Sequence, residues 1–323
     1  MKRFCLRVTV FLLLQALAFR WFVWDSNFPR EDNYLAALID KHKRLQASRP
    51  PRIILVGGCN LAFGVRSDQL EAALGRRVVN MGLLAGGGLD FMLNNVVGAV
   101  REGDVVVLSL EYQLFSEQGN LLHLMQMLEY RPAGFWAVPR QRWKRLLEES
   151  GLPILGNVVR RSLGFPPEAR PADPTDPHYS RQRFNRWGDY TGHYAQTENL
   201  SVHPPESPVW RPAMLQPMSS KQRTQLERFV EHCHRQGARI LYTCPPRPPE
   251  ALQQQGRVIE SILSNLKDIP NLEVIDTPAE QVYEHALFID TPYHLTGAGS
   301  RERTARLLAR LKSLLAADRG PGG

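Results

Sequence analysis

A single thiol stands at a predicted sharp turn, in the stretch ILVGGCNLAFG that covers residues 54–64. The apolar run before Gly57 and Gly58 is typical of a buried strand, and the glycine pair lets the backbone turn after it. Far along the chain, Asp290 and His294 lie four residues apart in FIDTPYHLTGAG, just before a predicted helix. These are the groups of nucleophilic catalysis, in which an imidazole takes the proton of Cys59 and a carboxylate orients the imidazole.

Alternating apolar runs and helical patterns surround these residues. RIILVGG, RRVVNMG, GDVVVLSLEY, ARILYTCPP and LEVID are typical of buried strands, and amphipathic helical segments separate them. This predicts an α/β fold with a five-stranded parallel sheet sandwiched by helices. Ligands of open parallel sheets bind at the carboxyl ends of the strands. The residues expected at that edge are Cys59, Asn80, Gly82, Glu111, Tyr112, Cys244, Asp290 and His294.

Three blocks carry a family resemblance that covers residues 52 to about 311. GGCNLAFG, NMGLLAGG and DTPYHLTGAG match, in order and position, the Gly-x-Ser turn, the Gly loop and the Asp-His block of the SGNH (GDSL-like) hydrolase superfamily. The chain most resembles the exported branch related to alginate O-acetylation proteins and to the D-alanyl transfer protein of teichoic acid modification. The resemblance implies a flavodoxin-like SGNH fold, with Cys59 in place of the nucleophilic serine, His294 as base and Asp290 as orienting acid. Gly86, or else Gly82, then takes the place of the oxyanion-hole glycine.

Two positions depart from the family pattern. The nucleophile is cysteine, and SLEYQLF stands where many members carry Gly-x-Asn-Asp with an oxyanion-hole asparagine. A carboxylate at Glu111 cannot donate a hydrogen bond to an oxyanion unless it is protonated. The missing donor is expected from Asn60 or from the stretch FNRWGDYTGH. That stretch offers Asn185, Asp189 and His193, which together with Glu111 and Tyr112 are the candidate substrate-binding residues.

Each of these residues also has a simpler interpretation. Cys59 could be an inert core residue or a relic of lost turnover, and Cys244 could pair with it in a disulfide. Cys233 shares a helical face with apolar residues, which predicts core packing. Glu111 and Tyr112 could make only structural contacts. The aromatic cluster of the cap, which is either a sugar-stacking surface or the cap's own small core, comprises Trp187, Tyr190, His193 and Tyr194.

The N-terminus has the pattern of an export signal. MKRFCLR is basic and VTVFLLLQALAF is apolar, which predicts either a signal peptide cleaved after the Ala16 and Ala18 pair or a signal anchor spanning Val8 to Trp24. We expect the anchor, in an inner membrane, with the rest of the chain facing the periplasm or cell exterior. The expected organisation is 1–24 leader, 25–50 stalk helix, 51–118 first half of the domain, 119–217 inserted helical and loop cap, 218–316 second half, and 317–323 flexible tail.

Composition argues against several function classes. The formal net charge is +8, but the basic residues are scattered and only seven are lysines, so no nucleic-acid partner is expected. The four cysteines form no close pair, and no histidine spacing reads as metal ligands, so neither a metal site nor a cofactor is expected.

The sequence therefore leads to one main hypothesis and one rival. The first is an extracytoplasmic acyltransferase or esterase that O-acetylates or deacetylates a cell-surface polysaccharide through Cys59, His294 and Asp290. A membrane-bound O-acyltransferase would be the partner that supplies the acyl group. The rival is a catalytically lapsed subunit of the same fold that binds polysaccharide or a membrane acyltransferase.

Overall fold

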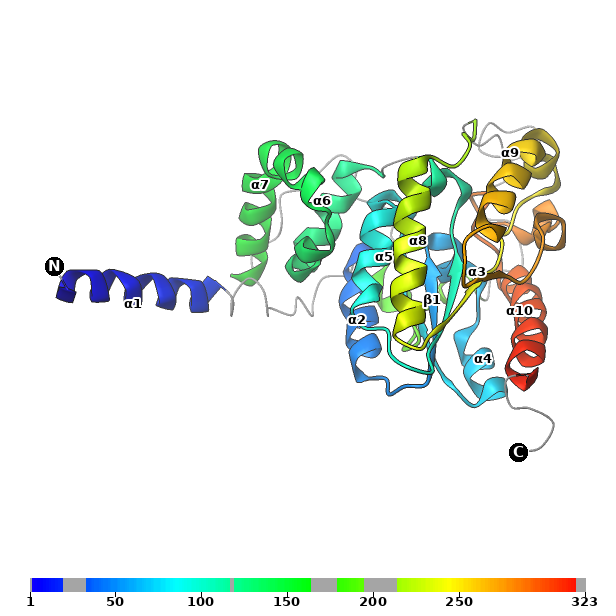
Figure 1. Cartoon of the computed structure of the whole chain (residues 1–323), viewed down its shortest axis with the longest axis horizontal. Coiled ribbons are helices and arrows are strands. Elements are labelled where there is room, and N and C mark those ends of the chain that lie inside the picture. Colours follow the sequence, from blue (N-terminus) through cyan, green and yellow to red (C-terminus); the bar gives the residue numbers. More distant parts are fainter. Residues whose placement is uncertain (1, 20–32, 117–118, 164–178, 195–213, 318–323) are drawn as a thin grey trace.

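The computed structural model describes residues 2–19, 33–116, 119–163, 179–194 and 214–317 (Figure 1). Its centre is a five-stranded, fully parallel sheet with strand order β2-β1-β3-β4-β5. This order is that of flavodoxin-type doubly wound sheets. The predicted α/β fold and its five parallel strands are confirmed. The strands are β1 (Arg52–Gly57), β2 (Arg77–Asn80), β3 (Val105–Ser109), β4 (Arg239–Tyr242) and β5 (Leu272–Val274).

Helices cover both faces of the sheet because successive side chains of each strand point to opposite sides. Ile54 and Val56 belong to one apolar cluster, whereas Ile53 and Leu55 belong to another. The first cluster is covered by α2 (Ala37–Ala47), α5 (Leu89–Val97), α8 (Ser220–Arg235) and α9 (Pro249–Lys267). The second is covered by α4 (Ser67–Leu74) and α10 (Gly297–Ala317). α5 and α8 run side by side in Figure 1.

Capping residues mark both ends of α8. The Ser219 hydroxyl accepts a hydrogen bond from the Gln222 N–H and so caps the helix. Gly237, just past the helix, adopts a left-handed φ of 78°, which only glycine takes without strain. The chain can therefore turn at once into β4.

The predicted stalk helix is part of the sandwich. A 3-10 turn (Tyr34–Ala36) leads directly into α2, and Tyr34, Leu35 and Leu38 are buried in the apolar core. The Tyr34 hydroxyl also donates to the Leu83 carbonyl at 2.7 Å. Residues 33–47 therefore do not stand clear of the domain as a spacer, because their apolar face is used for packing; residues 25–32 lie outside the described residues.

The inserted segment contains two helices where helical patterns were predicted. α6 (Leu121–Tyr130) and α7 (Arg140–Ser162) pack on each other, with a 3-10 segment (Pro132–Ala137) between them. They project from the sheet domain in Figure 1. Residues 179–194 lie against the sheet, where the N–H of Asn80 donates to the carbonyl of Trp187 at 2.9 Å. The predicted cap residues 164–178 and 195–213 lie outside the described residues.

The N-terminal helix α1 (Lys2–Phe19) contains the first part of the predicted membrane span. Residues 20–24 of that span are outside the described residues. Among the helices of the described part of the chain, none combines the length and apolarity needed to cross a membrane.

Candidate active site

The turn after β1 presents Cys59 because two glycines permit close packing there. A side chain at Gly57 would put its Cβ 2.1 Å from the Ser109 carbonyl oxygen, and one at Gly58 would put it 2.3 Å from Glu111 Oε1. Both distances are far inside van der Waals contact. The first turn of α3 (Cys59–Gly64) can therefore lie directly against the end of β3, with Cys59 partly exposed at the carboxyl edge of the sheet.

Asp290 and His294 meet as the sequence predicted. His294 Nδ1 lies 2.7 Å from Asp290 Oδ1, and the backbone between them is closed by a hydrogen bond from the Ile289 N–H to the His294 carbonyl at 2.9 Å. Phe63 of α3 stacks on the imidazole, with ring centroids 4.0 Å apart and planes at 9°. The ring is thus fixed by a carboxylate at one nitrogen and by an aromatic face. Its other nitrogen, Nε2, is buried and has no hydrogen-bond partner within the described residues.

The Cys59 thiol is the group that faces this imidazole. Burial raises the pKa of Cys59, with Glu111 and Asp290 adding to the rise and His294 opposing it. Burial alone would lower the pKa of His294, but its interactions with Cys59 and Asp290 outweigh burial and raise this pKa to about 10. A thiolate at Cys59 and an imidazolium at His294 thus stabilise each other, so the protonation of the two groups is coupled.

Glu111 occupies the backbone donors on either side of Cys59. Its carboxylate is fully buried and accepts hydrogen bonds from the N–H of Gly58 at 3.1 Å and of Asn60 at 3.2 Å. Glu111 Oε1 also lies 3.8 Å from the Cys59 sulfur. Two N–H groups that could stabilise an oxyanion are thus already bonded to a carboxylate of the protein itself.

Asn60 was predicted as an oxyanion donor, and the structure gives its side chain another task. The residue is fully buried, and its Nδ2 donates to the Ser109 carbonyl at 2.9 Å. Its Oδ1 accepts from the Ser109 hydroxyl and from Arg303, each at 3.0 Å. Both polar atoms of the amide are thus engaged in holding α3 against β3 and α10, although only one of the two Nδ2 hydrogens is used by the Ser109 carbonyl.

The two candidate oxyanion-hole glycines differ in what their surroundings allow. The Gly82 N–H donates to Asn80 Oδ1 at 2.9 Å and is therefore already bonded. Gly86 lies in the first turn of a 3-10 helix (Ala85–Gly87), where N–H groups have no partner within the helix. His123 of α6 packs over it, since a Cβ at Gly86 would come within 2.1 Å of His123 Nδ1. Gly86 is thus the better candidate of the two.

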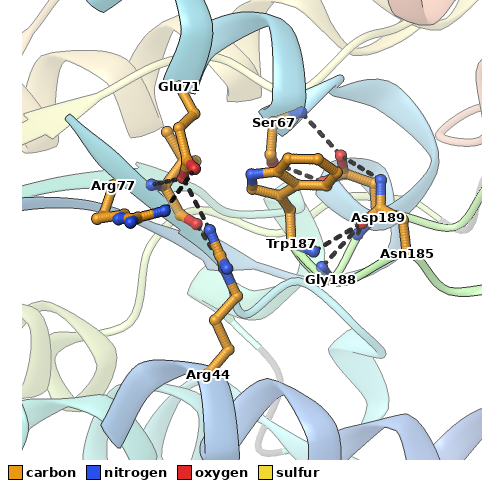
Figure 2. Close-up of polar contacts among 9 residues, drawn as sticks. Arg44, Ser67, Glu71, Arg77, Asn185, Trp187, Gly188 and Asp189 are labelled. Atoms are coloured by element: carbon orange, nitrogen blue, oxygen red, sulfur yellow. Dashed lines mark hydrogen bonds and ion pairs between the residues drawn. The ribbon is translucent and has the colours of Figure 1, made fainter. Parts of the chain in front are cut away.

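Asn185 and Asp189 form a turn that docks onto the sheet domain (Figure 2). Asp189 is fully buried, and its oxygens accept from the Ser67 N–H and hydroxyl at 2.7 and 2.5 Å, from Asn80 at 2.9 Å and from Asn185 at 3.1 Å. Asn185 Oδ1 accepts from the N–H groups of Trp187, Gly188 and Asp189. Both side chains hold the fold together, in contrast to the substrate contact that the sequence predicted.

Two members of the aromatic cluster, Tyr190 and His193, pack against Phe63 beside the candidate site, whereas Trp187 packs against the apolar cluster under α4 and α10. His193 is buried and stacks with Tyr190, with ring planes at 1° and centroids 5.9 Å apart, and it also contacts Phe63 at 5.2 Å. Burial lowers the pKa of His193 to about 3, so its ring is neutral at physiological pH. The observed packing corresponds to the cap-core interpretation. His193 and His294 both pack against the ring of Phe63.

Two polar residues at the site were missed in the sequence. The Tyr179 hydroxyl donates to Asp290 Oδ2 and lies 3.3 Å from His294 Nδ1. Arg303 of α10 is buried and donates to the Asn60 carbonyl at 2.7 Å and to the Ser109 hydroxyl at 2.8 Å. Neither carries a local signal, because Tyr179 is separated from Asp290 by 111 residues and Arg303 stands among other arginines of a helix.

The remaining thiols are accounted for. Cys59, Cys233 and Cys244 are all free, so the disulfide considered between Cys59 and Cys244 is not formed. Cys233 is buried in the apolar cluster beneath α8, as predicted. Cys244 is buried after β4, and its N–H donates to Asp276 at 2.7 Å. Within the described residues, no cluster of His, Cys, Asp or Glu could hold a metal ion.

Comparison with known proteins places no further constraint on this site. No protein-family model matches the chain, and a search of curated proteins gives no match.

Proposed function

We propose that this protein is an acyltransferase or esterase with a cysteine nucleophile, and that it O-acetylates or deacetylates a cell-surface polysaccharide. The observation that carries the proposal is the Asp290–His294 pair at 2.7 Å, whose imidazole has a buried Nε2 without a hydrogen-bond partner in the described residues and interacts with the Cys59 thiol. A held imidazole beside a thiol at a strand-to-helix turn is the arrangement that nucleophilic acyl transfer requires. The SGNH resemblance and the flavodoxin-type strand order support the same proposal.

The proposed reaction has two half-reactions. The Cys59 proton passes to His294 Nε2, the sulfur attacks the acyl carbonyl, and His294 returns the proton to the departing alcohol as the C–O bond breaks. The resulting thioester is then attacked by a sugar hydroxyl or by water, whose proton passes through His294 to the released thiol. Asp290 keeps the imidazole oriented and stabilises its charged form, as the raised pKa of His294 reflects.

The proposal includes a location and a partner. The basic head with Lys2, Arg3 and Arg7, followed by an apolar run, supports an extracytoplasmic, membrane-anchored protein. A membrane-bound O-acyltransferase would be the source of the acyl group, by the same resemblance.

A second function is favoured by one observation. Glu111 fills the N–H donors of Gly58 and Asn60 and helps to raise the pKa of Cys59. A site whose oxyanion donors hold a carboxylate suits a non-catalytic subunit that binds polysaccharide or a membrane acyltransferase. For the enzyme to work, either the Gly86 loop must supply the donors, or Glu111 must move away and free the N–H groups of Gly58 and Asn60.

A transfer assay separates the two functions. The protein is incubated at pH 9 with an activated acetyl ester and a neutral or acidic polysaccharide, and acetyl groups on the glycan are followed by NMR. The enzyme is expected to accelerate transfer or ester hydrolysis, and Cys59→Ala to abolish the acceleration while binding glycan equally well. Glycan binding without any Cys59-dependent acceleration would favour the subunit.

A further inference from the structure

Arg247 is a buried cation with no ion-pair partner among the residues that the structure describes. It lies in the loop between β4 and α9, and its side chain is only 1% exposed. Its Nη2 donates to Gln255 Oε1 at 3.1 Å, but Nε and Nη1 have no hydrogen-bond partner among the described residues. Burying an unpaired charge is strongly unfavourable. The comparably buried Arg303 shows the usual arrangement, since its guanidinium donates to Asn60 and Ser109.

The unpaired guanidinium adjoins the candidate active site. It packs over the ring of Tyr293, 4.8 Å from the centroid, and Tyr293 directly precedes His294. Burial raises the pKa of Tyr293 to about 12, Arg247 opposes the rise, and Glu111 and Cys59 add to it. Tyr293 is therefore a neighbour of both Arg247 and Cys59.

A second donor lies next to this cation. Tyr112 follows β3, is fully buried, and its hydroxyl has no oxygen or nitrogen partner within the described residues. Burial raises the pKa of Tyr112, the neighbouring Cys244 thiol adds to the rise, and Arg247 opposes it. Two guanidinium nitrogens that lack an acceptor, and a hydroxyl whose only neighbouring acceptor is the weakly accepting Cys244 sulfur, follow adjacent strands and match the needs of a carboxylate or phosphate.

We propose that Arg247 and Tyr112 form a subsite for an anionic group of the substrate, either a sugar carboxylate or a phosphate. The claim that the bound molecule is a substrate rests on the proposed function. The subsite then narrows the substrate class to an anionic glycan or a phosphorylated donor. The binding of the anion itself does not depend on Cys59, so the two proposals can fail separately.

The test measures the thermal unfolding midpoint, Tm, of the full chain in sodium glucuronate and in inorganic phosphate. Sodium chloride at equal ionic strength and glucose are the controls. We expect one or both anions to raise the Tm of the wild type and of Cys59→Ala by about 2 °C or more, since a ligand of the native state stabilises it. Arg247→Met should remove this rise, and Tyr112→Phe should reduce it.

Without anion, the two buried arginines should respond in opposite ways. Arg247→Met removes an unpaired charge and should leave Tm unchanged or raise it, whereas Arg303→Met breaks a bonded network and should lower it. A rise with glucuronate alone identifies a sugar carboxylate, and a rise with phosphate alone identifies a phosphate. The subsite is refuted if wild type responds to neither anion, if Arg247→Met responds equally, or if it loses as much stability as Arg303→Met.

Acetyl uptake by Cys59 is measured on the same samples. An anion response without acetyl uptake would leave the subsite standing while the acyl chemistry fails. Acetyl uptake without an anion response would support the acyl chemistry and refute the subsite.

Discussion

The carboxylate of Glu111 lies 3.8 Å from the sulfur of Cys59, and the same carboxylate accepts the N–H groups of both residues that flank the thiol. A negative charge therefore stands where an oxyanion would be stabilised in an acyl-transfer enzyme. His294 opposes this charge from the other side, and the balance between the two decides how reactive the thiol is.

The first expected consequence is a slow thiol at neutral pH. Because the thiolate is the reactive form and the pKa of Cys59 is raised, its alkylation by iodoacetamide at pH 7.5 should be about tenfold or more slower than that of an ordinary exposed thiol. The rate should rise with pH beyond 9. His294→Ala removes the group that lowers this pKa and should slow the reaction further. Peptide mapping measures both rates at once, with the exposed Cys5 as internal reference. A Cys59 that reacts faster than Cys5 at pH 7.5 would contradict the raised pKa of Cys59.

Glu111→Gln should make the thiol more reactive. The substitution removes a negative charge that raises the pKa of Cys59, so we expect alkylation of Cys59 at pH 7.5 to accelerate by roughly tenfold. The amide retains a single acceptor oxygen for two N–H donors, so the free energy of unfolding should fall by about 1–3 kcal/mol. Glu129→Gln is the matched control, since Glu129 is buried and bonded to Asn157 in the cap. Equal alkylation rates in wild type and Glu111→Gln would show that Glu111 does not control the thiol.

Tyr179→Phe should weaken the Asp290–His294 pair without unfolding the domain. The Tyr179 hydroxyl helps to lower the pKa of Asp290, and removing it leaves one carboxylate oxygen without that donor. A hydrogen bond to a charged group is worth about 1.5–3 kcal/mol, so acetyl transfer should fall roughly tenfold to a hundredfold. Tyr283→Phe, which removes a buried hydroxyl bonded to Gln281, is the control and should leave transfer unchanged. The assignment fails if both variants transfer acetyl at the wild-type rate.

Asp189→Ala tests the structural role of the docked turn. Ser67, Asn80 and Asn185 would lose an acceptor inside the protein, and the free energy of unfolding should fall by about 3 kcal/mol or more. Urea unfolding measures the loss, while alkylation of Cys59 in the folded variant should match wild type. A loss of stability below about 1 kcal/mol, together with loss of glycan binding, would instead make Asp189 a substrate contact.

The sequence was sufficient to predict the sheet, because continuous apolar runs and well-placed glycine and serine signals leave little choice of strand and helix. It was also sufficient to bring Cys59, Asp290 and His294 to one edge, since the carboxyl ends of parallel strands meet there. The sequence was not sufficient to assign the roles of Asn60, Asn185 and Asp189. Polar side chains near a predicted site look the same in the sequence whether they face substrate or bond to one another in the core.

Long-range partners were beyond the reach of sequence patterns. Tyr179 contacts Asp290 because of how the cap folds back over the sheet domain, and no local pattern shows this. Glu111 contacts the turn at Cys59 because Gly57 and Gly58 let α3 lie close to the end of β3. The stalk prediction was wrong for residues 33–47 because a charged, helix-prone segment can still bury a narrow apolar face, as Leu38 and Leu45 do.

The most direct test of the account is whether Cys59 forms a thioester. The Cys5→Ser form of the full chain is treated at pH 9 with an activated acetyl ester and measured by intact mass, alongside the same chain carrying Cys59→Ala or His294→Ala. Neutral hydroxylamine, which cleaves thioesters, is added to a second portion of each sample. The account expects one hydroxylamine-labile acetyl group that is absent from Cys59→Ala and appears far more slowly in His294→Ala. If all three proteins take up the same acetyl groups, Cys59 is not a working nucleophile and the binding subunit becomes the better account.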